Sequence, residues 1–286
     1  MYPVNKRQRY LSLKDDCFNH GVWLHDRIFE NTIPVDIAFI GSSHTINGID
    51  DKLIETELGS FNKKCHVLNM GYCRLGRNMH YTLLKELLKE KKPKVLVLEV
   101  TESENRYSHP IFPYVAEQKD ALLPTLFFNK DVLKDMYTAV AFKTQLMQED
   151  LFSQKQSPPI DLTPYGFSGH ADTAKATLLD SFYVKRNKPE EKQSELARRF
   201  YNTYPLSYLQ KMEGICKENQ IQLYFLYMPA YGVSSPPAEK EYYQAHGKLL
   251  CPPYSIFEKK EYWFDENHLN FAGTKALSKW VSGQLK

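Results

Sequence analysis

VDIAFIGSSHTIN, residues 35–47, is the stretch that decides the fold. Its short apolar run, Ile37 to Ile40, has the length of a buried strand and ends abruptly at Gly41. Two serines and a predicted helix follow, and a parallel strand delivers side chains to the carboxyl edge of a sheet in this way. Open α/β sheets bind ligands at that edge. Ser42 and Ser43 therefore have two interpretations: a reactive group, or a helix N-cap whose oxygen accepts amide protons.

Strands and helices alternate on both sides of a long interval in the middle of the chain. The alternation predicts an α/β class with right-handed crossovers and a parallel sheet. The predicted strands after the first are Cys65 to Met70, Lys94 to Val100, Ile221 to Met228 and a short fifth one at Tyr254 to Phe257. The predicted helices are Ile49 to Leu58, Asn78 to Lys91, Asp131 to Met147, Ala171 to Leu179, Glu190 to Asn202, Pro205 to Asn219 and Asn270 to Leu285.

We expect one domain over residues 1–286, with residues 103–204 as a largely helical insertion. So long an interval between strands is too much for a bare connection. Insertions above the carboxyl edge often form a lid or a substrate wall. The aromatic residues of the insertion could line such a wall or form a small core of their own, and we favour the core. They include Tyr107, Phe112, Tyr114, Tyr165 and Phe167.

Bulk composition excludes several classes of function. The chain has 286 residues, and 37 basic and 34 acidic residues give a formal net charge of only +3, with the signs interspersed. This gives no support for a nucleic-acid partner. No apolar run approaches the roughly 20 residues of a membrane helix, and no signal peptide is visible, although a chain whose membrane anchor was trimmed would look the same. The five cysteines are scattered without CxxC spacing, which supports neither a zinc site nor a disulfide framework.

A second polar stretch, WFDENHLN at residues 263–270, precedes the last predicted helix. Asp265 stands three positions ahead of His268, so the carboxylate can orient the imidazole through one ring nitrogen while the other nitrogen faces the site. A serine hydroxyl needs such a base because it is a weak nucleophile at its own pKa. The alternative is that Asp265 caps a turn and that His268 is a satisfied surface residue.

Taken together, these stretches resemble the SGNH hydrolase superfamily, also called GDSL-like esterases. The resemblance covers roughly residues 33–102 and 205–286, and it implies a three-layer α/β/α fold with a mostly parallel, flavodoxin-like sheet of about five strands. It implies that Ser43 is the nucleophile, His268 the base and Asp265 the residue that orients it. The amides of Ser43 and Gly71 would form the oxyanion hole, and no metal or organic cofactor is implied.

The chain departs from that family after the third strand. Typical members carry GxND there, whose asparagine donates to the oxyanion, whereas this chain reads Glu99-Val-Thr-Glu-Ser-Glu-Asn-Arg106. The resemblance makes Asn105 the candidate to replace that asparagine, although it lies several residues late. Loss of one oxyanion donor costs on the order of a hundred-fold in rate.

Four side chains near these blocks are candidates for substrate contacts. His44 follows the nucleophile position and could line the pocket, although a histidine at a helix start is more often structural. Arg74, Arg77 and Arg106 could bind an anionic or carbohydrate substrate, and solvated surface positions would look the same. Glu99 could pair with one of these arginines.

The resemblance is nearest to a cell-envelope branch that is often associated with acyl modification. It implies a serine-dependent esterase or O-acyltransferase for acylated carbohydrate, a cell-envelope polymer or a small ester, with an extracytoplasmic location if an anchor was trimmed and a cytoplasmic one otherwise. The alternative is a catalytically impaired glycan-binding or accessory protein. A nucleotide-binding flavodoxin-like protein is a third interpretation, but GYCRLG lacks the spacing of a phosphate loop. The sequence leaves the oligomeric state, acyl group and acceptor open.

Overall fold

The computed structural model describes residues 6–11, 13, 20–60, 65–117, 131–152, 158–186 and 194–286. Its centre is a five-stranded sheet in the order β2-β1-β3-β4-β5, with every neighbouring pair parallel. The strands are β1 (Ile37–Ile40), β2 (Val67–Asn69), β3 (Val95–Val100), β4 (Gln222–Tyr227) and β5 (Lys248–Leu250). The predicted α/β class and flavodoxin-like parallel sheet are confirmed.

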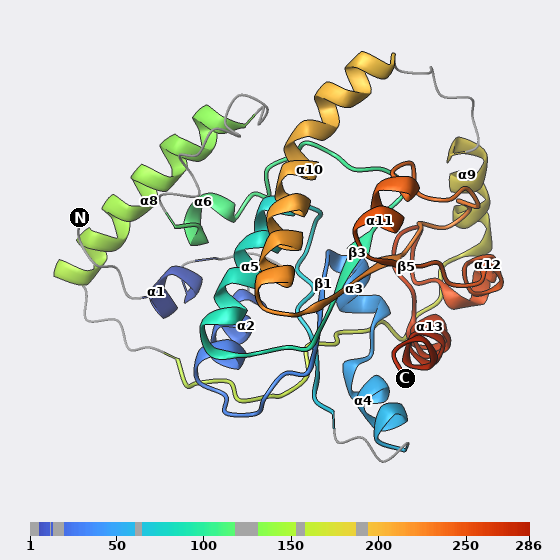
Figure 1. Ribbon diagram of the computed structural model, residues 1–286, viewed down its shortest axis with the longest axis horizontal. Helices are drawn as coiled ribbons and strands as arrows, with labels where there is room; N and C mark the ends of the chain where they lie inside the picture. Colours follow the sequence, from blue (N-terminus) through green and yellow to red (C-terminus); the bar gives the residue numbers. More distant parts are fainter. Residues whose placement is uncertain are drawn as a thin grey trace.

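Helices cover both faces of the sheet, which gives three layers (Figure 1). On one side lie α2 (His20–Phe29), α5 (Arg77–Glu90), α10 (Glu195–Glu218) and α11 (Lys240–His246). On the other lie α4 (Asp51–Gly59), α12 (Tyr254–Phe257) and α13 (Phe271–Gln284). The remaining elements are α1 (Lys6–Leu11), α3 (Ser43–Gly48), α6 (Phe112–Val115), α8 (Val132–Phe152), α9 (Ala176–Arg186) and η3 (Lys260–Tyr262).

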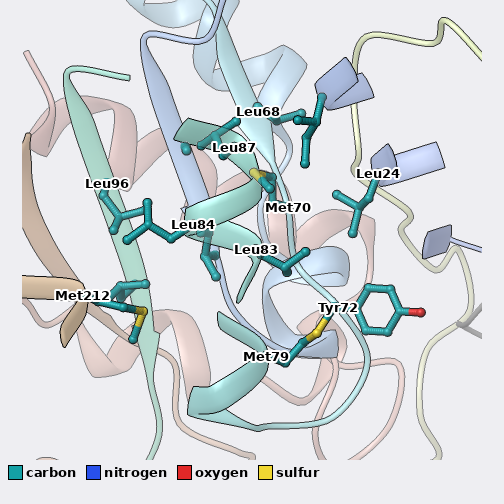
Figure 2. Close-up of a cluster of buried hydrophobic side chains, with 14 of the residues drawn as sticks. Leu24, Leu68, Met70, Tyr72, Met79, Leu83, Leu84, Leu87, Leu96 and Met212 are labelled. Atoms are coloured by element: carbon teal, nitrogen blue, oxygen red, sulfur yellow. The ribbon is translucent and has the colours of Figure 1, made fainter. Parts of the chain in front are cut away.

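The alternation of side chains along the strands divides the core in two. In β1, Ala38 and Ile40 pack on the α5 side, whereas Ile37 and Phe39 pack on the α13 side. Figure 2 shows part of the first cluster, where leucines and methionines of β2, β3, α5 and α10 meet. Because both faces are covered, the strands are mostly apolar, as parallel strands usually are, and the buried polar exceptions are Asn69 in β2 and Glu99 in β3.

Two predicted elements differ from the structure near the carboxyl half of the chain. Tyr254 to Phe257, predicted as the fifth strand, is the short helix α12, and the fifth strand is Lys248–Leu250 instead. The sequence pattern does not indicate this strand, because it is three residues long and only Leu250 is fully buried. The adjacent prolines, Pro252 and Pro253, precede α12, and proline favours the start of a helix over a sheet interior.

The two helices predicted on either side of Pro205 form one helix, α10. A proline inside a helix costs about 3 kcal/mol. The second half of α10 buries Leu209, Met212 and Cys216 against the sheet, and this packing outweighs the cost. Between β3 and α10 the described residues contain α6, α8, α9 and an extended segment, residues 158–175, so the predicted insertion is only partly helical.

Cys73 is disulfide-bonded, which corrects the expectation from cysteine spacing. Its loop joins β2 to α5, and the spacing of the scattered cysteines gave no signal of this bond. Cys65, Cys216 and Cys251 form no disulfide, and Cys216 is buried. Among the described residues, no helix is long and apolar enough to cross a membrane.

Candidate active site

The sheet order places the first serine block at the point where the chain changes direction. From β1 the chain moves outward to β2 and then returns past β1 to β3. The carboxyl ends of β1 and β3 therefore border the crevice in which doubly wound sheets hold their ligands. Ser43 begins α3 directly after β1, and Thr101 follows the end of β3. The fold thus brings Ser43 to the position that the sequence predicted.

Ser43, His268 and Asp265 lie in hydrogen-bonding contact. His268 Nε2 is 2.8 Å from Ser43 Oγ, across 225 positions of sequence. The other ring nitrogen, Nδ1, is 2.8 Å from Asp265 Oδ2 and 2.9 Å from Oδ1. A carboxylate only accepts, so Nδ1 carries the proton and Nε2 is left to accept the hydroxyl proton of Ser43. This is the geometry of an activated serine.

Asp265 also shapes its own loop, so both sequence interpretations of this residue hold. Its Oδ1 accepts the backbone amides of Asn267 and His268, each at 2.8 Å. Burial tends to raise the pKa of Asp265, but hydrogen bonds from the His268 ring and from these amides outweigh it, and the pKa lies below its usual value. Asp265 is therefore ionised at neutral pH, as the orienting role requires.

The loop of residues 263–270 is fixed at its base. Trp263 is 1% exposed, and its indole donates to Phe257 O at 2.9 Å. Trp263 and Leu269 form an isolated antiparallel bridge, and Asn270 caps α13 by accepting the amides of Ala272 and Gly273. His268 is thereby held between a closed turn and a capped helix.

The Glu99 carboxylate fixes the turn that contains Ser42 and Ser43. Glu99 is 1% exposed at the end of β3, and its carboxylate accepts four hydrogen bonds. These come from the amide and hydroxyl of Ser42, both at 2.7 Å, and from the amide and hydroxyl of Thr45, at 3.1 and 2.6 Å. Gly41 permits this approach, because a Cβ there would collide with Thr45 and Glu99. The Glu99 carboxylate therefore holds the turn of Ser43, and Arg77 contacts Glu99 at its carbonyl oxygen, to which Nη1 donates at 2.8 Å.

Ser42 is the helix cap of the serine block. Its oxygen accepts the amide of His44 at 3.2 Å while its hydroxyl donates to Glu99. The sequence left open whether these serines cap a helix or react, and the two roles are divided between them. Ser42 caps α3, and Ser43 faces His268.

The structure does not bring all three predicted oxyanion donors to Ser43. The amide of Gly71 donates to Asn69 Oδ1 at 2.9 Å, and Gly71 packs so closely on Ile46 that no Cβ would fit. Asn105 lines a neighbouring cavity, and its Oδ1 accepts the amide of Tyr107 at 3.1 Å. The amide of Ser43 opens α3, where helix amides have no intrahelical acceptor. The Gly71 amide is thus engaged by Asn69, and the Ser43 amide remains the candidate donor beside Ser43 Oγ.

The cavity in front of Ser43 has a volume of about 880 Å³. Its walls come from the loops that follow β1, β2, β3 and β4, together with α9 and Asn267. Predicted lining residues His44 and Arg74 belong to it, and Thr101, directly after β3, lines it as well. His44 Nδ1 donates to Met228 O at 3.2 Å, so its Nε2 is an acceptor in the neutral ring.

Sequence reasoning missed Arg186, the last residue of α9. Its Nη1 donates to Tyr231 O at 2.7 Å and to Glu266 O at 3.0 Å, and its Nη2 donates to Asn267 Oδ1 at 2.8 Å. The insertion thus ties directly to the loop that carries the catalytic pair. No local pattern marks this contact, because the partners lie 45 to 81 positions away.

Two other candidate arginines are engaged elsewhere. Arg77 is 2% exposed and pairs with Glu104, with Nε at 2.9 Å from Oε2 and Nη2 at 2.5 Å from Oε1. Arg106 lies over the ring of Tyr201, 4.7 Å from its centroid. Arg77 is therefore not available for a substrate contact, which corrects that expectation, and Arg106 is not among the residues that line the cavity of Ser43. The described residues contain no cluster of three or more His, Cys, Asp or Glu side chains that could hold a metal ion.

Comparison with known proteins gives little beyond these observations. No family model matches the chain, and no curated protein matches it. One solved structure, described as "a putative platelet activating factor from Streptococcus pneumonia", aligns over 98% of this chain and 93% of that chain. The identity is 15% and the TM-score is 0.34, so this likeness carries no argument about function.

Proposed function

We propose that this protein is a serine-dependent esterase or O-acyltransferase of the SGNH type that acts on acylated carbohydrate, a cell-envelope polymer or a small ester. The observation that carries the proposal is the 2.8 Å contact between His268 Nε2 and Ser43 Oγ, with Asp265 on the opposite ring nitrogen. Three residues from opposite ends of the chain form a hydrogen-bonded series, from the serine to the histidine to the aspartate, as acyl transfer requires.

In this mechanism Ser43 Oγ attacks the ester carbonyl while its proton passes to His268 Nε2. The tetrahedral intermediate carries an oxyanion, which the Ser43 amide stabilises. The C–O bond to the alcohol then breaks, and His268 returns the proton to the leaving oxygen. Water or a sugar hydroxyl attacks the acyl-Ser43 ester, with His268 again taking the proton, and Ser43 is released. Ionised Asp265 stabilises the imidazolium that forms in both halves.

The position of His44 supports the binding of a hydroxyl-rich substrate. Its ring lies edge-on to that of His268, with the centroids 5.7 Å apart, and it lines the same cavity. With Nδ1 donating to Met228 O, Nε2 would accept a hydrogen bond from a substrate hydroxyl. The disulfide at Cys73 is typical of proteins that mature in an oxidising compartment, which supports the extracytoplasmic alternative.

The test is covalent labelling of Ser43 by a neutral fluorophosphonate, read by intact mass and peptide mapping. We expect one adduct on Ser43, none on Ser43→Ala, and at least a hundred-fold slower labelling of His268→Ala. Ser255→Ala, a substitution on the exposed face of α12, is the matched control and should label like the wild type. Folded wild-type protein that forms no adduct would rule out the mechanism.

A second candidate function is a catalytically impaired domain that binds glycan or assists an acyltransferase. The observation that favours it is the oxyanion hole, because the Gly71 amide is engaged by Asn69 and Asn105 lies outside the cavity. Glycan binding that is equal in wild type, Ser43→Ala and His268→Ala, with no turnover of short acyl esters, would select this candidate over the enzyme.

A further inference from the structure

Arg74 is an exposed cation between two cavities. It lines the cavity of Ser43, and it also lines the neighbouring cavity of about 580 Å³ that contains Asn105. Its guanidinium has no hydrogen bond or ion pair with any residue that the structure describes. Arginine carries its charge at every physiological pH, so this position presents a permanent positive charge to whatever occupies the cavities.

The backbone under Arg74 is in a conformation that a side chain rarely adopts. Its φ is 70°, in the left-handed region where residues other than glycine and asparagine are uncommon. Such conformations are unfavourable and persist where the surroundings fix them. Here Cys73 is held by its disulfide, and its carbonyl accepts a hydrogen bond of 2.5 Å from His109 Nε2. A loop fixed by these contacts thus presents the exposed Arg74 side chain to both cavities.

The charges around the same cavity leave it with a positive balance. Arg186 lines it too, and its recorded partners are two backbone carbonyls and an amide oxygen, all of them neutral. The acidic residue of the lining is Glu102, whose carboxylate accepts the amide of Ala230 at 2.7 Å. Two guanidinium groups therefore face one carboxylate. Low-dielectric walls strengthen the attraction of such a site for anions.

We propose that the ester bound in front of Ser43 carries an anionic group, a carboxylate or a phosphate, and that Arg74 binds this group. The inference rests on the proposed function, since it concerns the substrate of the same site. Guanidinium binds both anions through paired N–H groups, so the shared chemistry is a planar or tetrahedral oxyanion. The second cavity, which begins at Arg74, is also lined by Asp131, Lys134 and Asp135. It therefore gives a neutral part of the substrate room to continue, and the anionic group is placed at Arg74 itself.

Three matched esters test this: 4-acetoxybenzoate, 4-acetoxyphenyl phosphate and the neutral 4-acetoxybenzamide. Each kcat/KM is divided by the rate of alkaline hydrolysis of the same ester, which removes differences in leaving-group reactivity. We expect wild type to favour at least one anionic ester over the amide on the order of tenfold, in line with a charged hydrogen bond. Half a molar salt should reduce the preference. The two anionic arms tell carboxylate from phosphate.

Variants assign the preference to Arg74. Arg74→Gln should bring the ratio of anionic to neutral ester close to one, and Arg74→Lys should retain part of it because the charge remains. Arg106→Gln, which removes a cation stacked on Tyr201 outside the cavity, should leave the ratio unchanged. Equal rates for the three esters in wild type, or a preference that survives Arg74→Gln, would overturn the inference.

The outcome is separable from that of the proposed function. Should the fluorophosphonate fail to label Ser43, the same three compounds are titrated against wild type and Arg74→Gln, and their Kd values take the place of kcat/KM. Tighter binding of an anionic compound that depends on Arg74 would sustain the anion site without catalysis. Labelled Ser43 with no anionic preference would overturn the anion site alone.

Discussion

Glu99 links the sheet to the nucleophile at the level of single atoms. All four donors on its carboxylate belong to Ser42 and Thr45, the residues on either side of the Ser43-His44 pair. Because these donors are buried with Glu99, each of them would lose its acceptor if the carboxylate were removed. Buried donors without partners cost about 1 to 3 kcal/mol each. The position of Ser43 Oγ therefore depends on a residue that does not touch the substrate cavity.

We predict that Glu99→Ala lowers the free energy of unfolding by about 3 kcal/mol or more and slows labelling of Ser43 at least tenfold. Glu99→Gln keeps one acceptor oxygen and should lose less of both. Urea unfolding and the labelling rate at a fixed probe concentration measure the two effects. A Glu99→Ala protein that labels at the wild-type rate would contradict this account of the turn.

At the scale of elements, the extended segment of residues 158–175 binds to several parts of the fold. Arg27 of α2 donates to Pro164 O at 3.0 Å, the Ser168 amide donates to Ile46 O at 3.2 Å, and the Phe271 amide donates to His170 O at 2.8 Å. Asp51 at the start of α4 joins this segment to β2, since Oδ2 accepts the amides of Gly166 and Asn69. The segment therefore contacts α2, α3, α4 and α13 in turn.

Asp51 should make stability depend on pH. Its side chain is fully buried, Oδ1 has no partner among the described residues, and burial raises the pKa of Asp51 to about 6. Between pH 4 and 6 the folded protein then holds more protons than the unfolded chain. The contribution of this carboxyl to stability is full below about pH 4 and falls by roughly 3 kcal/mol as the pH rises through 6.

We predict that Asp51→Asn gains stability relative to wild type as the pH rises, by up to about 3 kcal/mol between pH 4 and pH 7. The amide keeps an acceptor for the two backbone groups and carries no charge to bury. Urea unfolding at several pH values measures the difference, with Asp172→Asn on the exposed surface as the control. A difference between Asp51→Asn and wild type that does not vary with pH would show that Asp51 is not the titrating group.

At the scale of the whole molecule, one sheet supports two cores. Leu84 of α5 and Leu277 of α13 are each 0% exposed and belong to the clusters on opposite faces. Because the same strands contribute side chains to both clusters, neither core can open without exposing the backbone that supports the other. Loss of packing on either face should therefore weaken the same cooperative unit.

We predict that Leu84→Ala and Leu277→Ala each lower the free energy of unfolding by about 2 to 5 kcal/mol and shift one common transition. Leu133→Ala on α8, where the leucine is 79% exposed, should stay within about 0.5 kcal/mol of wild type. Calorimetry and tryptophan fluorescence together report whether the transition is shared. Separate transitions for the two core variants would show two independent units.

The strands β1, β3 and β4 could be predicted because each is a continuous apolar run with clear breakers, and parallel strands buried on both faces have that signature. Ser43, Asp265 and His268 could be proposed because their spacing to strand ends and helix starts is local. Strand β5 could not be predicted from the sequence, since three residues are too few to show a pattern of apolar residues. The sequence also could not predict three contacts: those of the Gly71 amide, of Glu99 and of Arg186. Each depends on partners that the sequence does not place side by side.

The contact between Ser43 and His268 has a consequence for synthesis of the chain. The nucleophile is translated 225 residues before its base. A nascent chain that has formed β1, α3 and β3 has the Glu99 contacts that hold the turn of Ser43, but it does not yet contain His268. The Ser43–His268 contact therefore forms only after the loop of residues 263–270 has been made and has docked. Contacts of such long sequence separation also slow folding, so the final docking of α13 should coincide with the onset of activity.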